Sequence, residues 1–586
     1  MATVYVSYTP KNDEKKPDGL IEANIGNTAV ALVPVEIGDE KLNCIQAAQK
    51  AGTFIPHYCW HPALSVVASC RMCLVEVGER KPDGAIAMQP RVVPGCQTPV
   101  KDGSVIVTNT PKVKLTQEQT LEGILINHPL DCPVCDKAGE CLLQDYTFGY
   151  GRATSRMIDQ KNTPPNKPNL GPNVSLFTDR CIMCSRCVRF TREVAGTAEL
   201  QIINRGNHAE IDVFPGEALD NKLASNVVDL CPVGALCSND FLYKHRVWNL
   251  KSVQSVCPDC STGCSIHLDG NKNIVYRLRP RENPQAQGYF MCDDGRLGYH
   301  YVNSKDRILK PLQQVNGQPK AIAWRETVAS IRTSFQEAAS ANGSGIVAMI
   351  SPWLTCEEAF LLARWVRSLS RDARLVLGPV PVVGEDDHYP KDRRGKSLPM
   401  VESSKPRFTI RAEKCPNRKG VSAVLQHFQG KLHTFEDLLG WAKAKQVQAL
   451  FVAASYPPRG TGWITSEQAQ TLRQAKTLVV QDLAPSPLSA TADWVLPGAA
   501  FAEKEGTFVN HAGLAQAIHW GVTPSGEVRT EGQVYLDLMQ RTGLLHVATL
   551  RKELAGEVRA FAPLAKGDLG SYGILLESLK DSPKGS

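Results

Sequence analysis

The chain has 586 residues, 19 of them cysteine, and a net charge of +7 from 66 Lys and Arg against 59 Asp and Glu. This length allows several domains, and so small a charge excess predicts neither nucleic-acid binding nor a basic membrane-binding tract. No apolar run approaches the roughly eighteen residues of a membrane-spanning helix, and the N-terminal residues lack the apolar core of a signal peptide. We therefore expect a protein of the reduced cytoplasm, in which cysteines bind metal and do not form disulfides.

Residues 1–110 are predicted to form a small β-rich, ferredoxin-like domain that holds the first cysteine set. Short alternating apolar segments such as CLVEV indicate strands, and LNCIQAAQKAG indicates one helix. A CxxC pair with one cysteine before it and one after it is typical of a plant-type 2Fe-2S site. A structural zinc would favour two separated CxxC pairs, and a Rieske site using His57 or His61 is not needed because four thiols suffice. The first set is Cys59, Cys70, Cys73 and Cys96.

Residues 111–162 combine a helical stretch, TQEQTLEGILINH, with a cysteine-dense loop. The spacing His-x3-Cys-x2-Cys-x5-Cys provides only three local cysteines, so a 4Fe-4S cluster needs a fourth ligand, and the imidazole of His128 stands just upstream. The alternative is that His128 caps its helix and that the fourth ligand lies elsewhere. The second set is His128, Cys132, Cys135 and Cys141.

A proline-rich linker at residues 163–173 precedes a 4Fe-4S ferredoxin-like segment at 174–250. The run CIMCSRC repeats the CxxCxxC pattern of bacterial ferredoxins, and a distant Cys-Pro follows in CPVGAL. With no second CxxCxxC run in the sequence, Cys231 most simply completes the same cluster, whereas Cys237 is either a competing ligand or a small buried thiol. The third set is Cys181, Cys184, Cys187 and Cys231.

Residues 251–306 carry the fourth set with the spacing CxxCxxxC, followed after 27 intervening residues by a fourth cysteine. The spacing is of the iron-sulfur type, and structural zinc is the alternative. The fourth set is Cys257, Cys260, Cys264 and Cys292.

Residues 307–586 are predicted to be an α/β domain with a largely parallel sheet. Apolar runs such as IVAMI and ALFVAA indicate buried strands, and Thr355 with Glu358 forms a capping box that begins a helix. A polar insertion at about 378–406 indicates a surface loop or arm. GSGIVA fits a dinucleotide motif by chance, because its glycines precede the strand, and RRGKS lacks the upstream glycine of a P-loop.

These four sets in this order, followed by the α/β region, resemble the large iron-sulfur subunit, or G subunit, of bacterial NADH-quinone oxidoreductase, respiratory complex I. The motifs that carry the resemblance are IPHYCWHPALSVVASCRMCLVEV, HPLDCPVCDKAGECLLQDYTFGYG, CIMCSRCVRF and LCPVGAL. The resemblance implies a multidomain α+β and α/β fold whose C-terminal domain is of the molybdopterin-oxidoreductase type. The sequence departs from that type at His511–Leu514, where the family commonly has a Glu-Gly-Arg turn, and no bound molybdopterin is expected.

The same resemblance implies one 2Fe-2S cluster and two 4Fe-4S clusters in line, with a third 4Fe-4S cluster, held by the fourth set, away from the main path. It implies partners that bear the flavin and the NADH site, and other partners on the quinone side of the peripheral arm. The implied location is peripheral, on the cytoplasmic side of the inner (plasma) membrane, with membrane contact only through those partners. No nucleic-acid partner and no substrate site in this polypeptide are expected.

A second class of function is an enzyme in its own right, either a molybdenum oxidoreductase or the diaphorase part of a soluble hydrogenase or formate dehydrogenase. This class needs a metal ligand in the α/β region, where Cys356 and Cys415 are the thiol candidates. Cys356 also occupies an ordinary first-turn position of a helix. The long α/β tail favours the complex I subunit.

Overall fold

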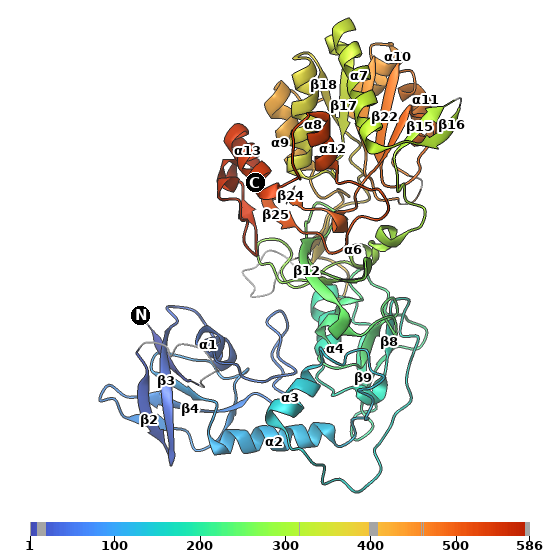
Figure 1. The fold of residues 1–586 in the computed structure, drawn as a ribbon. Coiled ribbons are helices and arrows are strands. Elements are labelled where there is room, and N and C mark those ends of the chain that lie inside the picture. Colours follow the sequence, from blue (N-terminus) through green and yellow to red (C-terminus); the bar gives the residue numbers. More distant parts are fainter. Residues whose placement is uncertain are drawn as a thin grey trace. The chain divides into compact units, whose positions relative to one another are not determined.

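The computed structural model describes residues 2–8, 19–315, 317–397, 408–458, 460 and 462–580. The chain divides into two compact units, Met1–Trp248 with Pro390–Lys405 and Asn249–Tyr389 with Pro406–Ser586. Figure 1 shows both units coloured along the sequence. Within the described ranges, no helix is long and apolar enough to cross a membrane.

The first unit begins with a mixed sheet, which confirms the β-rich character predicted for the N-terminal region. The strands run in the order β2-β3-β1-β7-β4-β5, with β6 paired to β4, and β1 lies parallel to β7. Helix α1 (Cys44–Lys50) begins at a capping box formed by Asn43 and Gln46 and buries Ile45 against the sheet. The strands are β1 (Thr3–Ser7), β2 (Ile21–Ile25), β3 (Thr28–Glu36), β4 (Leu74–Arg80), β5 (Ile86–Met88), β6 (Val93–Pro94) and β7 (Ser104–Val107).

The rest of the first unit consists mostly of loops around the second and third cysteine sets. Its longest helix, α2, begins at Pro111 under a Thr110 cap and ends at Leu125, so His128 lies in the turn beyond it. Strand β8 pairs with β11 and β9 with β10. The elements are α2 (Pro111–Leu125), α3 (Leu142–Tyr150), β8 (Val174–Leu176), α4 (Arg186–Phe190), β9 (Leu200–Ile203), β10 (Glu210–Val213), α5 (Asn226–Leu230) and β11 (Leu236–Ser238).

The second unit contains two small antiparallel sheets. One is the meander β12-β13-β14, which carries the fourth cysteine set at its end, and the other is β24-β25-β26. Their elements are β12 (Lys251–Val256), β13 (Ser265–Asn271), β14 (Ile274–Pro280), α6 (Asp293–Leu297), β24 (Gly506–Val509), β25 (Leu514–Ile518) and β26 (Ile574–Leu575).

The main sheet of the second unit has the order β16-β15-β23-β22-β21-β17-β18, and the five strands from β23 to β18 are parallel. This confirms the predicted α/β domain. The strands are β15 (Leu312–Val315), β16 (Gln318–Ala321), β17 (Ile346–Ile350), β18 (Arg374–Leu377), β21 (Ala449–Ala453), β22 (Thr477–Asp482) and β23 (Trp494–Pro497).

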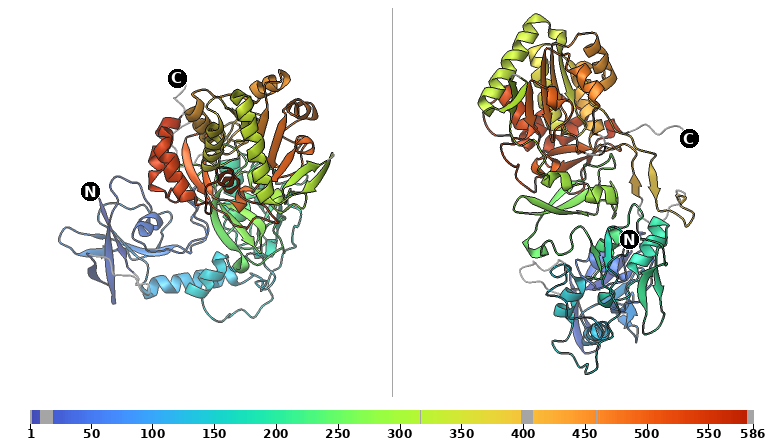
Figure 2. Two further views of the ribbon diagram at one scale, coloured as in Figure 1. Left: turned by 45° about the horizontal axis from the view of Figure 1, so that its top comes forward. Right: turned by 90° about the vertical axis from the view of Figure 1, so that its right-hand side faces the viewer.

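Helices cover both faces of this sheet (Figures 1 and 2). Side chains at alternate strand positions pack against α7, α8, α9, α12 and α13 on one face, and the other positions pack against α10 and α11. Strand β17 is therefore buried along its whole length. The helices are α7 (Trp324–Ala341), α8 (Cys356–Leu369), α9 (Arg418–Gln429), α10 (Phe435–Lys443), α11 (Ser466–Leu472), α12 (Glu531–Leu538) and α13 (Val547–Glu557).

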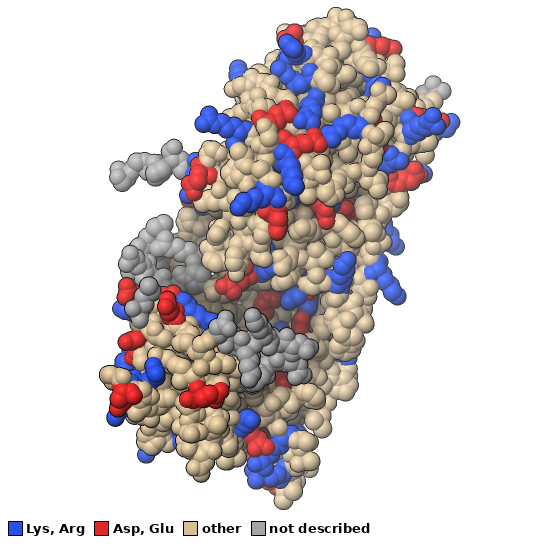
Figure 3. Space-filling model, turned by 60° about the vertical axis from the view of Figure 1, so that its left-hand side comes forward, with Lys and Arg blue, Asp and Glu red and all other residues tan. Residues whose placement is uncertain are grey.

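The polar insertion at about 378–406 is more ordered than the surface loop that the sequence indicates. It contains β19 (Asp387–Tyr389), paired with β20 (Phe408–Ile410), and residues 390–397 pack in the first unit, where Lys391 N donates to Val194 O at 3.0 Å. Residues 398–407 of the insertion lie outside the described ranges. On the face shown in Figure 3, basic and acidic side chains are intermixed, in keeping with the small net charge.

Candidate metal centres

The structure brings the four thiols of the first set together in the loops between α1 and β7. Hydrogen bonds from the Cys70 and Cys96 side chains lower the pKa of Cys59, and a hydrogen bond from Cys96 lowers the pKa of Cys73. The loop takes this shape because Ala68 and Arg71 adopt left-handed backbone conformations, with φ of 50° and 58°. Four thiols in mutual contact form a donor set suited to iron and sulfide.

The second set lies in the loop between α2 and α3. Cys135 is buried, Cys141 is half-buried at the N-cap of α3, and Cys132 is exposed. Cys135 lies in the electrostatic field of Cys132, and Cys141 in that of Cys135. The backbone of this loop is fixed by Asp131, whose carbonyl accepts from the N–H groups of Val134 and Cys135 at 2.8 and 2.7 Å.

The imidazole of His128 is a half-buried ring with an unused nitrogen. Its Nδ1 atom is buried and has no hydrogen-bond partner. Burial, with smaller contributions from Lys161 and Arg180, lowers the pKa of His128 to about 4, so the ring is neutral near pH 7. A neutral imidazole with a free nitrogen is a competent metal ligand, and His128 also lies in the field of Asp131, in the same loop as the three cysteines.

All four cysteines of the third set line one small cavity, together with Ser185 and Arg186. Aliphatic side chains such as Ile182 and Leu236 complete its wall. Met183 and Ser185 turn the CIMCSRC loop inward with φ of 52° and 57°, and Cys231 enters from the end of α5. Burial raises the pKa of Cys184 to about 11. Cys237 does not line this cavity, and its thiol donates instead to Gly234 O at 3.6 Å.

The fourth set lies in the second unit, at one end of the β12-β13-β14 meander. Cys257 follows β12, Cys264 precedes β13, and Cys257 N donates to Cys264 O at 2.8 Å. Cys292 caps α6, and its sulfur accepts from Gly295 N at 3.4 Å. All four side chains are buried, and burial in the field of the other three thiols raises the pKa of Cys264 far above its usual range.

Among the residues that the structure describes, no group of three or more His, Cys, Asp or Glu side chains is placed to hold a single metal ion. Each set is therefore defined by contacts and electrostatic fields between its thiols. The donor chemistry of all four sets, which comprises thiols and one neutral imidazole, fits iron-sulfur clusters.

Two buried arginines join the loops of the first and third sets, and the cysteine spacing predicts neither of them. The Arg189 guanidinium donates to the carbonyls of Cys59 and Cys184, and Arg186 donates to the carbonyls of Trp60 and Leu230. The only signal in the sequence was the presence of two cations inside a cysteine motif that must fold inward.

The loops of the third and second sets also touch. Leu142, next to Cys141, donates its N–H to the carbonyl of Pro232, next to Cys231, at 3.0 Å. The buried thiol of Cys237 lies in the fields of both Cys135 and Cys231. The loop of the third set is thus joined both to the loop of the first set and to the loop of the second set.

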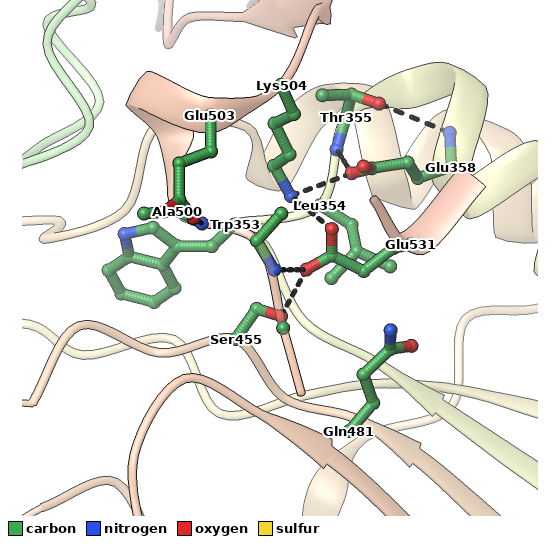
Figure 4. Close-up of polar contacts among 12 residues, drawn as sticks. Trp353, Leu354, Thr355, Glu358, Ser455, Gln481, Ala500, Glu503, Lys504 and Glu531 are labelled. Atoms are coloured by element: carbon green, nitrogen blue, oxygen red, sulfur yellow. Dashed lines mark hydrogen bonds and ion pairs between the residues drawn. The ribbon is translucent and has the colours of Figure 1, made fainter. Parts of the chain in front are cut away.

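In the second unit, strand order reverses at β17, which has β18 on one side and β21 on the other. In open α/β sheets, ligands bind at the carboxyl ends of the strands at such a point. Here the protein's own side chains meet beyond those strand ends (Figure 4). Lys504 pairs with Glu358 at 2.9 Å and Glu531 at 3.3 Å, and Ser455 donates to Glu531 at 2.6 Å. All four residues are at most 3% exposed.

Both leftover thiols of the α/β region are buried. Cys356 is fully buried at the first turn of α8 and donates to Asn417 Oδ1 at 3.5 Å. Burial raises the pKa of Cys356 and of Cys415 far above the usual range, so both thiols stay protonated at neutral pH. Cys415 lies in the field of Cys260 of the fourth set.

Five family models match the chain in succession. They are a 2Fe-2S iron-sulfur cluster binding domain at 38–111, the NADH-ubiquinone oxidoreductase-G iron-sulfur binding region at 117–156, the ferredoxin-like domain of NADH-quinone oxidoreductase subunit 3 at 171–237, the Fe4S4 domain of molybdopterin oxidoreductases at 250–304, and molybdopterin oxidoreductase itself at 432–541. These matches confirm the predicted fold class and the presence of 2Fe-2S and 4Fe-4S domains.

Proteins of other organisms are similar over part of the chain. The G subunit of the NADH-quinone oxidoreductase of Rickettsia conorii is 36% identical over 324 residues, which are 55% of this chain and 46% of the relative. The NADH-ubiquinone oxidoreductase 75 kDa subunit of Reclinomonas americana is 35% identical over 349 residues, 60% of this chain and 49% of the relative. The resemblance noted in the sequence is confirmed, and the chain spans about half the length of these curated relatives.

A solved structure of an NAD+-reducing [NiFe]-hydrogenase in its H2-reduced state is 27% identical to the chain. The matched region covers 37% of this chain and 88% of the hydrogenase chain, with a TM-score of 0.32. A likeness of that size supports no conclusion about function.

Proposed function

We propose that the protein is an electron-transfer subunit of an NADH-quinone oxidoreductase, of the kind formed by the G and 75 kDa subunits to which it is similar. When bound, the clusters would accept and release single electrons, and the polypeptide would set their spacing, their insulation from water and their potentials. The proposed ligands are Cys59, Cys70, Cys73 and Cys96 for one 2Fe-2S cluster, and His128, Cys132, Cys135 and Cys141, then Cys181, Cys184, Cys187 and Cys231, then Cys257, Cys260, Cys264 and Cys292 for three 4Fe-4S clusters.

One observation carries this proposal: the first three sets form a continuous series of contacts in a single unit. Arg186 and Arg189 join the first set to the third, and the Leu142–Pro232 hydrogen bond joins the third set to the second. Electron transfer between buried centres needs such short, well-packed protein paths. We propose that the cluster of the fourth set lies off this path, as the resemblance to the G subunit implies.

The domain division that we propose is 1–110, 111–162, 174–250, 251–306 and 307–586, with the last domain retained without molybdopterin. The residues beyond β17 and β21 do not fit that cofactor. The phosphate of that cofactor is anionic, whereas an ion-pair network with two carboxylates and one ammonium occupies the space beyond these strand ends. In addition, the backbone N–H of Glu358, in the first turn of α8, already donates to the Thr355 hydroxyl and is not available to a phosphate.

The proposed partners are a flavin- and NADH-binding subunit on the donor side and peripheral-arm subunits on the quinone side. The proposed location is peripheral, on the cytoplasmic side of the inner (plasma) membrane, with membrane contact only through these partners. The names of the similar proteins support membership of an NADH-quinone oxidoreductase complex.

The test is electron transfer in the assembled complex carrying Cys184→Ala. We expect NADH-to-quinone electron transfer to be lost, while NADH oxidation with an artificial acceptor at the flavin remains. Cys356→Ser is the matched control, because that thiol is buried and belongs to none of the four sets, and it should leave both activities unchanged. Full quinone reduction by an assembled Cys184→Ala complex would refute the proposal.

A further inference from the structure

Arg186 and Arg189 are buried cations whose hydrogen bonds go to neutral groups. Arg189 is 1% exposed, and its Nη2 donates to Cys59 O at 2.5 Å and to Cys184 O at 3.2 Å. Its other donors reach Ser65 O and the carbonyl and hydroxyl of Ser185. Arg186 is 7% exposed and donates to Trp60 O at 2.6 Å and Leu230 O at 3.3 Å.

Several other buried cations of the described residues have carboxylate partners. Lys504 has Glu358 at 2.9 Å, Arg307 has Glu503 at 2.6 Å, and Arg551 has Glu357 at 3.1 Å. Burying a charge is costly unless an opposite charge compensates for it. The two arginines of the first unit therefore need negative charge from another source.

The carboxylate of Glu193 lies in the field of Arg189 but binds elsewhere. Its oxygens accept from Ser65 N at 3.0 Å and from Ser65 Oγ. The sulfurs of Cys184 and Cys59 also lie in the field of Arg189, and both carry negative charge when they bind a cluster as thiolates. Arg189 thus lies between one cysteine of the first set and one of the third.

We propose that Arg186 and Arg189 are the counter-charges of the 2Fe-2S cluster of the first set and the 4Fe-4S cluster of the third set. This inference rests on the proposed function. A cluster with four thiolates carries net negative charge and gains more on reduction, so a fixed cation beside it stabilises the reduced form. The two guanidiniums therefore raise both reduction potentials, and their bonds hold the two ligand loops together.

The test is a redox titration of the full-length protein, purified anaerobically and followed by the electron paramagnetic resonance signals of its clusters. Arg189→Gln should retain both signals and lower the midpoint potentials of the first and third clusters by at least about 59 mV, which is a tenfold change in a one-electron equilibrium. Arg189→Lys keeps the charge and should stay closer to the wild-type values. The potential of the fourth cluster should not move, because Arg189 donates only to groups near the first and third sets.

Arg192→Gln is the matched control, because its side chain is 45% exposed in the same segment and pairs with Glu193 at 3.5 Å. It should leave all potentials unchanged. Unchanged potentials in an assembled Arg189→Gln protein would overturn the inference. If Arg189→Gln fails to bind clusters, the potentials of Arg186→Gln decide by the same criterion. Loss of clusters in Arg189→Lys would show that the site needs the shape of arginine and not its charge, and this result would also overturn the inference. Absence of cluster signals in the wild type would instead refute the proposed function.

Discussion

Gly234 packs directly on the thiol of Cys135: a β-carbon placed on Gly234 would lie 2.1 Å from Cys135 Sγ. The φ angle of Gly234 is not in the left-handed region, so glycine is required there for space and not for conformation. Gly234 follows Cys231 by three residues, so the loop of the third set packs directly on Cys135, a proposed ligand of the second cluster. The two sites can approach each other closely only while this position has no side chain.

We therefore predict that Gly234→Ala disturbs the second cluster and slows electron flow between the second and third. The added methyl group must displace either the Cys135 thiol or the Cys231–Gly234 loop. The measurements are the electron paramagnetic resonance signal of the second cluster and the rate of its reduction in freeze-quench experiments. Gly149→Ala is the control, since no atom lies within 4 Å of a β-carbon there. A wild-type signal and rate in Gly234→Ala would show that this contact is unimportant.

Replacing His128 with Cys should keep the second 4Fe-4S cluster but lower its potential. A thiolate is charged where imidazole is neutral, and so it stabilises the oxidised cluster. A redox titration measures the shift, with His208→Cys as a control that adds a thiol at an exposed histidine of the same unit. An unchanged spectrum and potential in His128→Cys would mean that His128 is not a ligand.

The buried carboxyl of Glu358 should make the second unit less stable as the pH rises. Burial, opposed by Lys504 and assisted by Glu531, raises the pKa of Glu358 from 4.5 to about 7. Between these two pKa values the carboxyl of Glu358 is protonated in the folded state but ionised in the unfolded state. The contribution of Glu358 to the stability of the fold therefore falls between pH 4.5 and about pH 7 and is constant above that range. The loss is on the order of 3 kcal/mol.

Glu358→Gln mimics the protonated group and should remove this slope. Thermal unfolding of the second unit from about pH 5 to about pH 8 measures the difference in stability between wild type and variant. The pKa of Asp482 is similarly raised, but Asp482 is present in both proteins, so its contribution cancels in this difference. Glu505→Gln, whose side chain is 42% exposed, is the control. A stability difference between wild type and Glu358→Gln that stays constant from about pH 5 to about pH 8 would show that the pKa of Glu358 is not raised.

Local sequence signals predicted the elements but not the contacts between them. The run IVAMI forms β17, and Thr355 and Glu358 form the capping box of α8, because both depend on neighbouring residues. Cysteine spacing grouped Cys231 with the cysteines of CIMCSRC, and the structure brings all four to the lining of one cavity. The roles of Arg189 and Gly234 escaped prediction, since their partners lie 130 and 99 residues away in the sequence, at Cys59 and Cys135. The predicted helix over residues 116–128 begins earlier and ends at Leu125, which leaves His128 in a turn.

The most direct test of whether the protein holds four iron-sulfur clusters is its metal content when it is isolated without oxygen. Four clusters held by the sets described above require about fourteen irons per molecule, with matching acid-labile sulfide and little zinc or molybdenum. Replacing Cys184 with Ala should reduce the iron by about four, the content of one cubane cluster. Stoichiometric zinc with little iron in the wild-type protein would contradict the account.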